Sequence, residues 1–179
     1  RLPAPKVQRA NVSELAQEAI FLLQNEHRSV SFSLQSESKE TLINCDPGQI
    51  VRAFNNVLIN AVHAVLGRAA EEDDGFIPKI EVAILTGDQS VTVICSDNGK
   101  GFSPDVLESA LEPYVTTKED GSGLGLSIVQ RVIEEHRGSL RIQNRDEGGA
   151  AIEIRLPTNL NVTENIGIDP EKMIVRKTS

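Results

Sequence analysis

The feature that most constrains this chain is a run of three alternating glycines placed directly before an amphipathic helical pattern. The glycines are Gly121, Gly123 and Gly125. Glycine lets a backbone approach another molecule closely, and the first turn of a helix carries N–H groups without partners at the positive end of the helix dipole. The run therefore predicts a cradle for phosphate groups. Taken alone, the glycines are also compatible with an ordinary loop before a helix.

The residues around these glycines exclude two common phosphate-binding motifs. Thr116, Thr117 and Lys118 add hydroxyls and a cation just upstream. The run does not end in Gly-Lys-Ser/Thr, so it is not a P-loop. It is not a dinucleotide fingerprint either, because the spacing is G-x-G-x-G and the preceding segment does not have the pattern of a strand.

Length and composition fit a single domain. The chain has 179 residues and a formal net charge of −8, and a chain of this size buries roughly 70% of its unfolded surface. The negative charge argues against a nucleic-acid partner. We recognise no signal peptide in the sequence and expect no apolar run long enough to cross a membrane. We therefore expect a cytoplasmic domain.

The cysteines and the chain ends add two expectations. Cys45 and Cys95 lie in strand-like runs, which is typical of small core residues in a reducing compartment, with a disulfide as the alternative. The chain starts at Arg1 and its one methionine is Met173, so we expect a piece of a longer protein.

Apolar periodicity predicts an α/β protein, a two-layer sandwich in which a mixed sheet packs on helices. Residues 1–10 fit an extended linker, residues 11–157 the domain, and the tail 158–179 carries no assignment. The expected helices span residues 12–27, 47–70, 104–111 and 123–137. The expected strands span residues 30–34, 42–45, 79–86, 90–96, 140–143 and 151–156.

Capping residues set the helix boundaries. Asn11 and Glu14 form a start similar to a capping box. Asp46 precedes Pro47, which places a capping side chain before a proline at the first helical position. Gly138 fits the glycine that commonly ends a helix.

Five residues of the longest expected helix recur at spacings of four, four, three and four, so they share one face. They are Arg52, Asn56, Asn60, His63 and Gly67. Paired amides can offer oxygens to a hard cation or N–H groups to phosphate. For the stripe alone, an ordinary solvated face is the better interpretation, and His63 by itself fits a histidine at the rim of a site more than a catalytic one.

A second constellation follows a predicted strand. Asp97 falls at the end of that strand, where ligands meet open sheets. Its carboxylate could accept a hydrogen bond from an exocyclic amine, and Gly99 and Gly101 would leave room for a flat base. A hairpin turn at Asn98-Gly99 is the alternative. It is weakened because a helix start at Pro104, and not a returning strand, comes next.

Four motifs together resemble the N, G1, F and G2 boxes of the ATP-binding catalytic domain of sensor histidine kinases, in that family's order and spacing. The motifs are residues 56–61, 97–101, 113–118 and 121–126. The resemblance covers about residues 11–157. Segment 112–118 and the first five residues look most like the nitrogen-regulation sensor kinases.

The resemblance implies the Bergerat ATP-binding fold, shared with gyrase, the heat-shock chaperone of the ninety class and the mismatch-repair ATPase, with ATP and Mg²⁺ as cofactors. It implies that Asn60 ligates Mg²⁺, Asn56 helps to bind the triphosphate, and Asp97 reads the adenine amino group. Gly99 and Gly101 would line the base pocket. His63 is also implied to bind ATP. The remaining implied ATP-binding residues belong to or follow a mobile lid over residues 112–122, and they are Thr116, Thr117, Lys118, Gly121, Ser122, Gly123, Leu124, Gly125 and Leu126. Lys118, with Asn60, would be catalytic.

The sequence departs from the family's pattern in two places. His27, His63 and His136 all lie outside a His-Glu or His-Asp motif, so the phosphate acceptor is expected on another domain, and residues 1–10 would be the exit from its helical hairpin. Ala150 and Ala151 stand where a threonine and often a phenylalanine appear in the family, so we expect Asp97 to lack the support of a hydroxyl.

The function implied is that of a two-component histidine kinase catalytic domain, which positions Mg·ATP for transfer of the γ-phosphate to a histidine elsewhere. The implied partners are the dimerisation domain of the parent kinase and a response regulator, and we expect this fragment to be monomeric. Whether the parent is anchored in a membrane stays open. The alternative is a nucleotide-sensing module that regulates a partner by lid closure. An ATPase of the chaperone or mismatch-repair kind is disfavoured, because the lid is short and no carboxylate is evidently placed to activate water.

Overall fold

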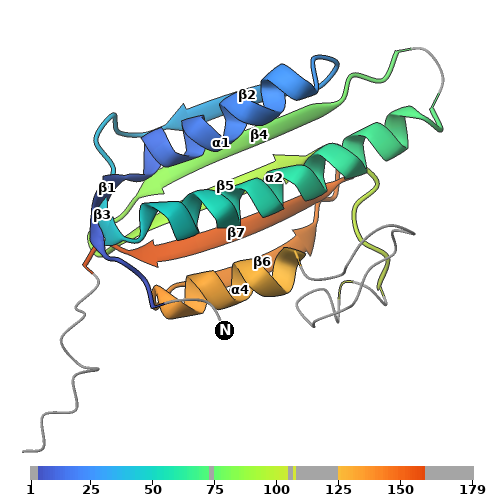
Figure 1. Ribbon diagram of the computed structural model, residues 1–179. Coiled ribbons are helices and arrows are strands. Elements are labelled where there is room, and N and C mark those ends of the chain that lie inside the picture. Colours follow the sequence, from blue (N-terminus) through green and yellow to red (C-terminus); the bar gives the residue numbers. More distant parts are fainter. Residues whose placement is uncertain (1–3, 73–74, 105–106, 108–124, 160–179) are drawn as a thin grey trace, which may run out of the picture.

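A computed structural model describes residues 4–72, 75–104, 107 and 125–159. They form a five-stranded sheet with helices on one face (Figure 1). The strand order is β2 (Ser31–Ser36), β4 (Lys79–Thr86), β5 (Ser90–Asp97), β7 (Ala150–Pro157) and β6 (Ser139–Asn144). Strands β2 and β4 run parallel and the other neighbours run antiparallel, so the sheet is mixed, as predicted.

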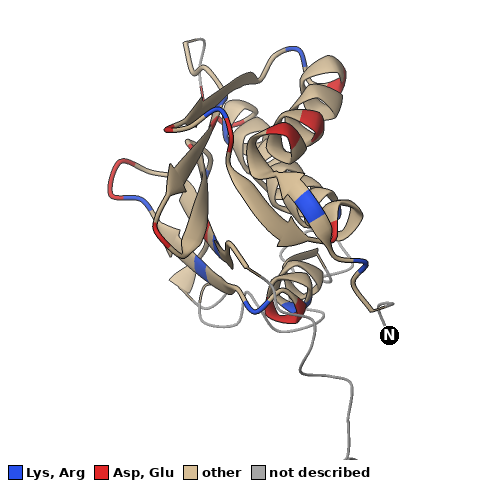
Figure 2. Ribbon diagram, turned by 90° about the vertical axis from the view of Figure 1, so that its left-hand side faces the viewer, with Lys and Arg blue, Asp and Glu red and all other residues tan. Residues whose placement is uncertain are grey.

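The three helices that are described cover the same face of the sheet, as Figure 2 shows from one end of the molecule. They are α1 (Val12–Glu26), α2 (Pro47–Ala69) and α4 (Gly125–Glu135). In β4 and β5, every second side chain is buried beneath them, whereas the residues between are partly or fully exposed. This alternation confirms a two-layer α/β sandwich whose core lies between the sheet and the helices.

The capping residues start the helices as the sequence predicts. The Asn11 side chain accepts a hydrogen bond from the Ser13 amide at 3.1 Å, and its Nδ2 donates to Glu14. Asp46 accepts a hydrogen bond from the Gln49 amide at 3.1 Å, with Pro47 at the first helical position. Each cap satisfies backbone donors that the first turn leaves unpaired.

A small second sheet was not expected from the sequence. Strand β1 (Gln8–Asn11) pairs antiparallel with β3 (Leu42–Cys45), so part of the segment expected to be a linker is a strand. The pairing joins residues more than 30 positions apart, such as Asn11 and Leu42. The four residues of β1, Gln-Arg-Ala-Asn, show no alternation of apolar and polar side chains, so the local pattern does not indicate a strand.

The end of α4 has a different cause from the one predicted. Arg137, and not Gly138, takes the left-handed conformation, with φ of 55°. Gly138 is required by close packing, because a Cβ there would lie 2.4 Å from the Arg155 carbonyl oxygen and 2.8 Å from Ile133 Cγ2. Residues 123–124 of the predicted helix 123–137 and most of the predicted helix 104–111 lie outside the described residues. The amide of Leu107 does donate to the carbonyl of Ser103 at 2.8 Å.

His136 ties the end of α4 to the start of α2. The side chain is buried, its Nδ1 lies 2.7 Å from the carbonyl oxygen of Val132, and its Nε2 accepts a hydrogen bond from the amide of Asp46 at 3.0 Å. Because Nε2 is the acceptor, Nδ1 carries the proton and the ring is neutral. This histidine is therefore structural.

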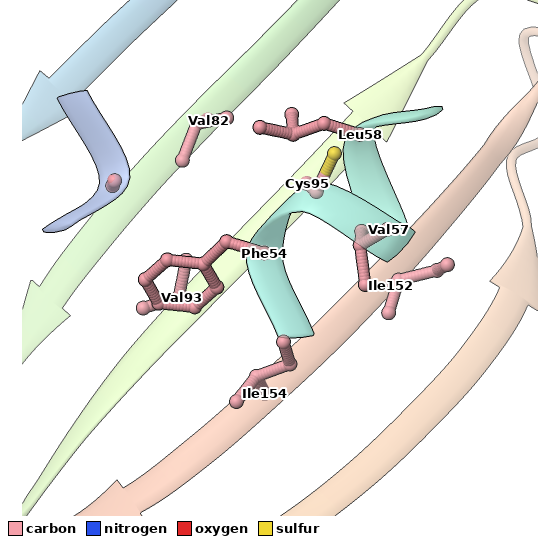
Figure 3. A pocket seen from close by; sticks show the side chains of 9 residues that line it. Phe54, Val57, Leu58, Val82, Val93, Cys95, Ile152 and Ile154 are labelled. Carbon is pink, nitrogen blue, oxygen red and sulfur yellow. The ribbon is translucent and has the colours of Figure 1, made fainter. Parts of the chain in front are cut away.

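A small apolar cavity of about 10 Å³ lies in the core between the helices and the sheet (Figure 3). Its walls are Ala16, Phe54, Val57, Leu58, Val82, Val93, Cys95, Ile152 and Ile154. A space of this size without polar partners does not hold an ordered water, and it is far too small for a nucleotide.

Helix α2 is long and apolar enough to cross a membrane by length and composition, contrary to our expectation that no such run exists. Its packing gives another reason for this composition, because α2 contacts α1, α4 and the sheet. Cys45 and Cys95 are free thiols in the core, and burial raises the pKa of Cys45 to about 11 and that of Cys95 to about 12. The two thiols are not joined, so the disulfide alternative is wrong.

Candidate nucleotide-binding site

Helix α2 divides its residues between the core and the candidate site. Phe54, Val57 and Leu58 point toward the sheet (Figure 3). The predicted polar stripe follows another side, where Asn56 and Asn60 are half-buried. The segregation arises because residues three or four apart share a helix face.

The two asparagines face the start of α4. A methyl group built on Gly125 would lie 3.6 Å from Asn60 Nδ2 and 3.7 Å from Asn56 Oδ1. Asn56 Nδ2 donates to the carbonyl of Arg52 at 2.9 Å, and this bond directs Oδ1 away from its own helix backbone. Motifs more than 60 residues apart, predicted separately, are therefore adjacent.

Asp97 lies at the end of β5 and is only 6% exposed. Its Oδ1 accepts hydrogen bonds from the amides of Gly99 at 2.8 Å and Ala150 at 3.4 Å. Burial raises the pKa of this carboxyl, while the two hydrogen bonds and the charge of Arg145 act to lower it. Ala150 thus supports Asp97 through its backbone amide, although it has no hydroxyl. Both bonds from described residues use Oδ1, so Oδ2 is the oxygen that can accept from a ligand.

The residues after Asp97 form a turn packed against α2. A Cβ on Gly99 would lie 2.6 Å from the backbone carbon of Ala64, so only glycine fits there without a shift. Gly101 has a φ of 71°, which glycine adopts readily. Asn98 Oδ1 accepts from the amide of Lys79 at 2.8 Å, tying the turn to the start of β4. The chain does not return as a hairpin, and that alternative is wrong.

Three side chains that hold this turn were missed by the sequence analysis. Arg68 Nη1 donates to the carbonyl of Asn98 at 2.9 Å, and Arg145 Nη1 donates to the carbonyl of Asp97 at 3.1 Å. Asn144 bonds both the amide and the carbonyl of Phe102, at 2.8 and 2.7 Å. Arg68 directly follows the polar stripe, which was the one available signal. Nothing near Arg145 or Asn144 in the sequence points to a turn some 45 residues away.

Other predicted site residues are distributed as follows. On α2, Arg52 and His63 are exposed, and Gly67 faces Lys100, whose Cε would be 3.6 Å from a Cβ there. Leu126 on α4 is half-buried against the core. The predicted residues that lie outside the described part of the chain are Thr116, Thr117, Lys118, Gly121, Ser122, Gly123 and Leu124.

The site's chemistry suits a hard cation only in combination with a ligand. Within the described ranges, no three His, Cys, Asp or Glu side chains gather as metal ligands. The candidate ligand is the amide oxygen of Asn60. Mg²⁺ prefers oxygen ligands, and in nucleotide sites phosphates and water supply the others. The residues therefore fit a Mg²⁺ ion that arrives with a nucleotide.

Comparison with known proteins decides the family. The sequence pattern of the family described as "Histidine kinase-, DNA gyrase B-, and HSP90-like ATPase" matches residues 45–160. The chain belongs to this family. The match contains both Asn60 and Asp97, together with the whole glycine run.

Curated relatives narrow the class to sensor histidine kinases. A putative NtrY-like sensor histidine kinase of Rickettsia conorii is 39% identical over 157 residues, which are 87% of this chain and 25% of the relative. The sensor histidine kinase ZraS of Salmonella typhimurium is 35% identical over 153 residues, 84% of this chain and 31% of the relative. The chain thus spans about a quarter to a third of these proteins. It is the ATP-binding catalytic domain of a two-component sensor histidine kinase, as the sequence analysis predicted.

Solved structures agree on the fold. The catalytic domain of histidine kinase ThkA, in a nucleotide-free form, has a TM-score of 0.75 at 25% identity and covers 86% of this chain and 97% of its own. The mycobacterial sensor histidine kinase MprB has a TM-score of 0.72 at 22% identity, with 87% and 99% covered. A structure of ThkA with the response regulator TrrA has a TM-score of 0.71 at 23% identity, covering 86% of this chain and 42% of that one.

Proposed function

We propose that this domain binds ATP together with Mg²⁺ and presents the γ-phosphate to a histidine on a separate domain of its parent kinase. The observation that carries the proposal is the contact between the described start of α4 and the two amides of α2 at Gly125, Asn56 and Asn60. It joins a helix start suited to phosphate to oxygen donors suited to the cation that accompanies phosphate.

Each described residue then has a distinct task. Asn60 would hold Mg²⁺ through its amide oxygen, and Asn56 would contact the triphosphate. Asp97 would accept a hydrogen bond from the adenine amino group through Oδ2. Bound Mg²⁺ would supply neutralisation of phosphate charge. The protein's own contribution is positioning, because phosphoryl transfer needs the reacting groups held in line more than it needs covalent chemistry from side chains.

Four further parts of the account remain proposals. The roles of His63, Lys118 and the rest of segment 112–126 rest on the family resemblance. The phosphoacceptor hairpin upstream of the linker 1–10 also rests on the resemblance. A response regulator as a later partner is supported by the solved complex of a histidine kinase with such a protein. We also propose that the isolated domain is monomeric and that it works in the cytoplasm, which two buried free thiols support.

The test is to supply the phosphate acceptor. The domain is mixed with the helical hairpin of its parent kinase and γ-labelled ATP, and acid-labile phosphate on the hairpin is measured over time. We expect labelling that requires Mg²⁺ and is lost in Asn60→Ala. ATP binding without any labelling of the hairpin would instead support the alternative, a nucleotide-sensing module.

A further inference from the structure

Two arginines from different parts of the fold donate hydrogen bonds to consecutive carbonyls of the turn that carries Asp97. Arg145 Nη1 donates to the Asp97 carbonyl at 3.1 Å. Arg68 Nη1, from the last turn of α2, donates to the Asn98 carbonyl at 2.9 Å and lies 3.5 Å from that of Gly99. Hydrogen bonds from a charged donor are shorter and stronger than neutral ones. The turn is therefore held on both sides by positive charge.

Arg145 is itself firmly placed. Its amide donates to the Gly149 carbonyl at 3.0 Å, and its own carbonyl accepts from the Gly148 amide at 3.0 Å, so it is part of the tight turn between β6 and β7. Its side chain is only 26% exposed. Gly149 lets this turn lie directly on Asp97, because a Cβ there would be 2.0 Å from the Asp97 carbonyl oxygen.

We propose that Arg145 is a positioning residue for base recognition, which fixes Asp97 through its backbone carbonyl and keeps the carboxylate ionised for the adenine amino group. The proposal rests on the proposed function, in which Asp97 reads adenine. Arg145 itself would not touch the nucleotide. Its effect would appear as a preference for adenine over guanine, and as the pH range in which that preference holds.

The electrostatic part follows from what surrounds Asp97. Burial raises the pKa of Asp97, and Arg145 is the one charged side chain among its described neighbours that acts to lower it. The other titratable groups on the elements around the turn are Cys95 on β5, Lys79 and Glu81 on β4, and Arg68 on α2, and none of them acts to lower the pKa of Asp97. Removing the Arg145 charge would leave burial less opposed. The carboxyl would then take up a proton at higher pH and cease to be a pure acceptor.

The experiment measures ATP and GTP affinities across pH with the intact domain and saturating Mg²⁺. The ratio of the two affinities is used because titration of the phosphates is shared by both nucleotides and cancels. In Arg145→Gln we expect the preference for ATP at the acidic end of the pH range to fall by at least roughly fivefold relative to the parent. We also expect the midpoint of its pH dependence to move to higher pH. Arg145→Lys retains the charge, so its midpoint should stay near that of the parent, even if ATP binds more weakly.

Two comparisons separate this role from a structural one. Arg68→Gln also removes a charged hydrogen bond to the turn. It should weaken the affinities for ATP and GTP alike, without moving the midpoint of the pH dependence. Glu147, whose Oε2 lies 3.4 Å from Arg145 Nη2, has a side chain that is 87% exposed, so Glu147→Gln is the matched control and should behave like the parent.

Three results would overturn the proposal. The first is an unchanged ratio and midpoint in Arg145→Gln. The second is a midpoint that Arg145→Lys moves upward, and this variant decides the matter if Arg145→Gln does not fold. The third is a parent protein that binds ATP and GTP equally, which would remove Asp97 from base reading altogether and is recognisable before any variant is made.

Discussion

Replacing each of two neighbouring glycines by alanine separates backbone strain from collision with the turn that carries Asp97. Gly148 and Gly149 have φ values of 91° and 86°, so both substitutions force an L-residue into an unfavourable conformation. That cost is about 1–2 kcal/mol for each. They differ in their surroundings. The new Cβ of Gly148→Ala would lie 3.2 Å from Arg68 Nη1, a side-chain atom that would have to move by only a few tenths of an ångström and would stay within reach of the Asn98 carbonyl. That of Gly149→Ala would lie 2.0 Å from the backbone oxygen of Asp97.

The collision adds a second cost to Gly149→Ala alone. Overpacking in a dense interior costs about 1–3 kcal/mol, so we expect a total loss of about 2–5 kcal/mol, against about 1–2 kcal/mol for Gly148→Ala. Both values lie within the total stability of an ordinary domain, about 5–15 kcal/mol, although the larger loss would be a substantial part of it. Because the collision displaces Asp97, ATP affinity should also fall in Gly149→Ala and remain near the parent value in Gly148→Ala.

The assay is urea unfolding of both variants and the parent, followed by calorimetric ATP titration under conditions in which each is folded. Equal losses of unfolding free energy in the two variants would refute the collision. A Gly149→Ala protein that binds ATP as tightly as the parent would refute the link between the turn and Asp97.

Three other outcomes follow from the same geometry. Gly99→Ala should lower the free energy of unfolding by about 1–3 kcal/mol, because its Cβ would meet the α2 backbone at 2.6 Å. Gly67→Ala, on the facing helix α2, should raise the free energy of unfolding by about 0.5–1 kcal/mol. If urea unfolding showed that both substitutions change this free energy in the same direction, the packing would be contradicted. Asp97→Asn should be more stable than the parent at neutral pH, with the gain vanishing in acid. The pKa of Asp97 is raised in the folded state, so its protonated form adds stability below the usual aspartate pKa. This stability is lost as pH rises through the folded-state pKa. A stability difference between Asp97→Asn and the parent that does not depend on pH would count against this. His136→Leu should cost about 1–3 kcal/mol, because the Asp46 amide loses its acceptor, and an unchanged melting temperature would contradict the structural role of that ring.

Local signals in the sequence predicted most of the fold. The start of α2 was fixed by Asp46 and Pro47, and its predicted end at residue 70 is one residue from the observed Ala69. Strands β4 and β5 alternate buried and exposed residues, and both were placed to within one residue. These features depend on neighbours within one or two turns or on strand period, which a single sequence displays directly.

The features that were missed depend on contacts between distant segments. Strand β1 exists because of its pairing with β3. Gly138 was predicted for the wrong reason, since its requirement comes from Arg155 across the fold. Arg68 and Arg145 reach backbone carbonyls 30 and 48 positions away. Any arginine can make such a bond, so its partner is set by the tertiary structure and not by a motif.

Calorimetric titration with ATP, in the presence and absence of Mg²⁺, tests the central claim most directly. The claim is that Asn60 and the start of α4 form one Mg·ATP site. For the parent domain we predict that Mg²⁺ tightens ATP binding, and for Asn60→Ala that this tightening is abolished while the far-UV circular dichroism stays that of the folded protein. A folded Asn60→Ala domain that binds Mg·ATP as tightly as the parent would contradict the claim.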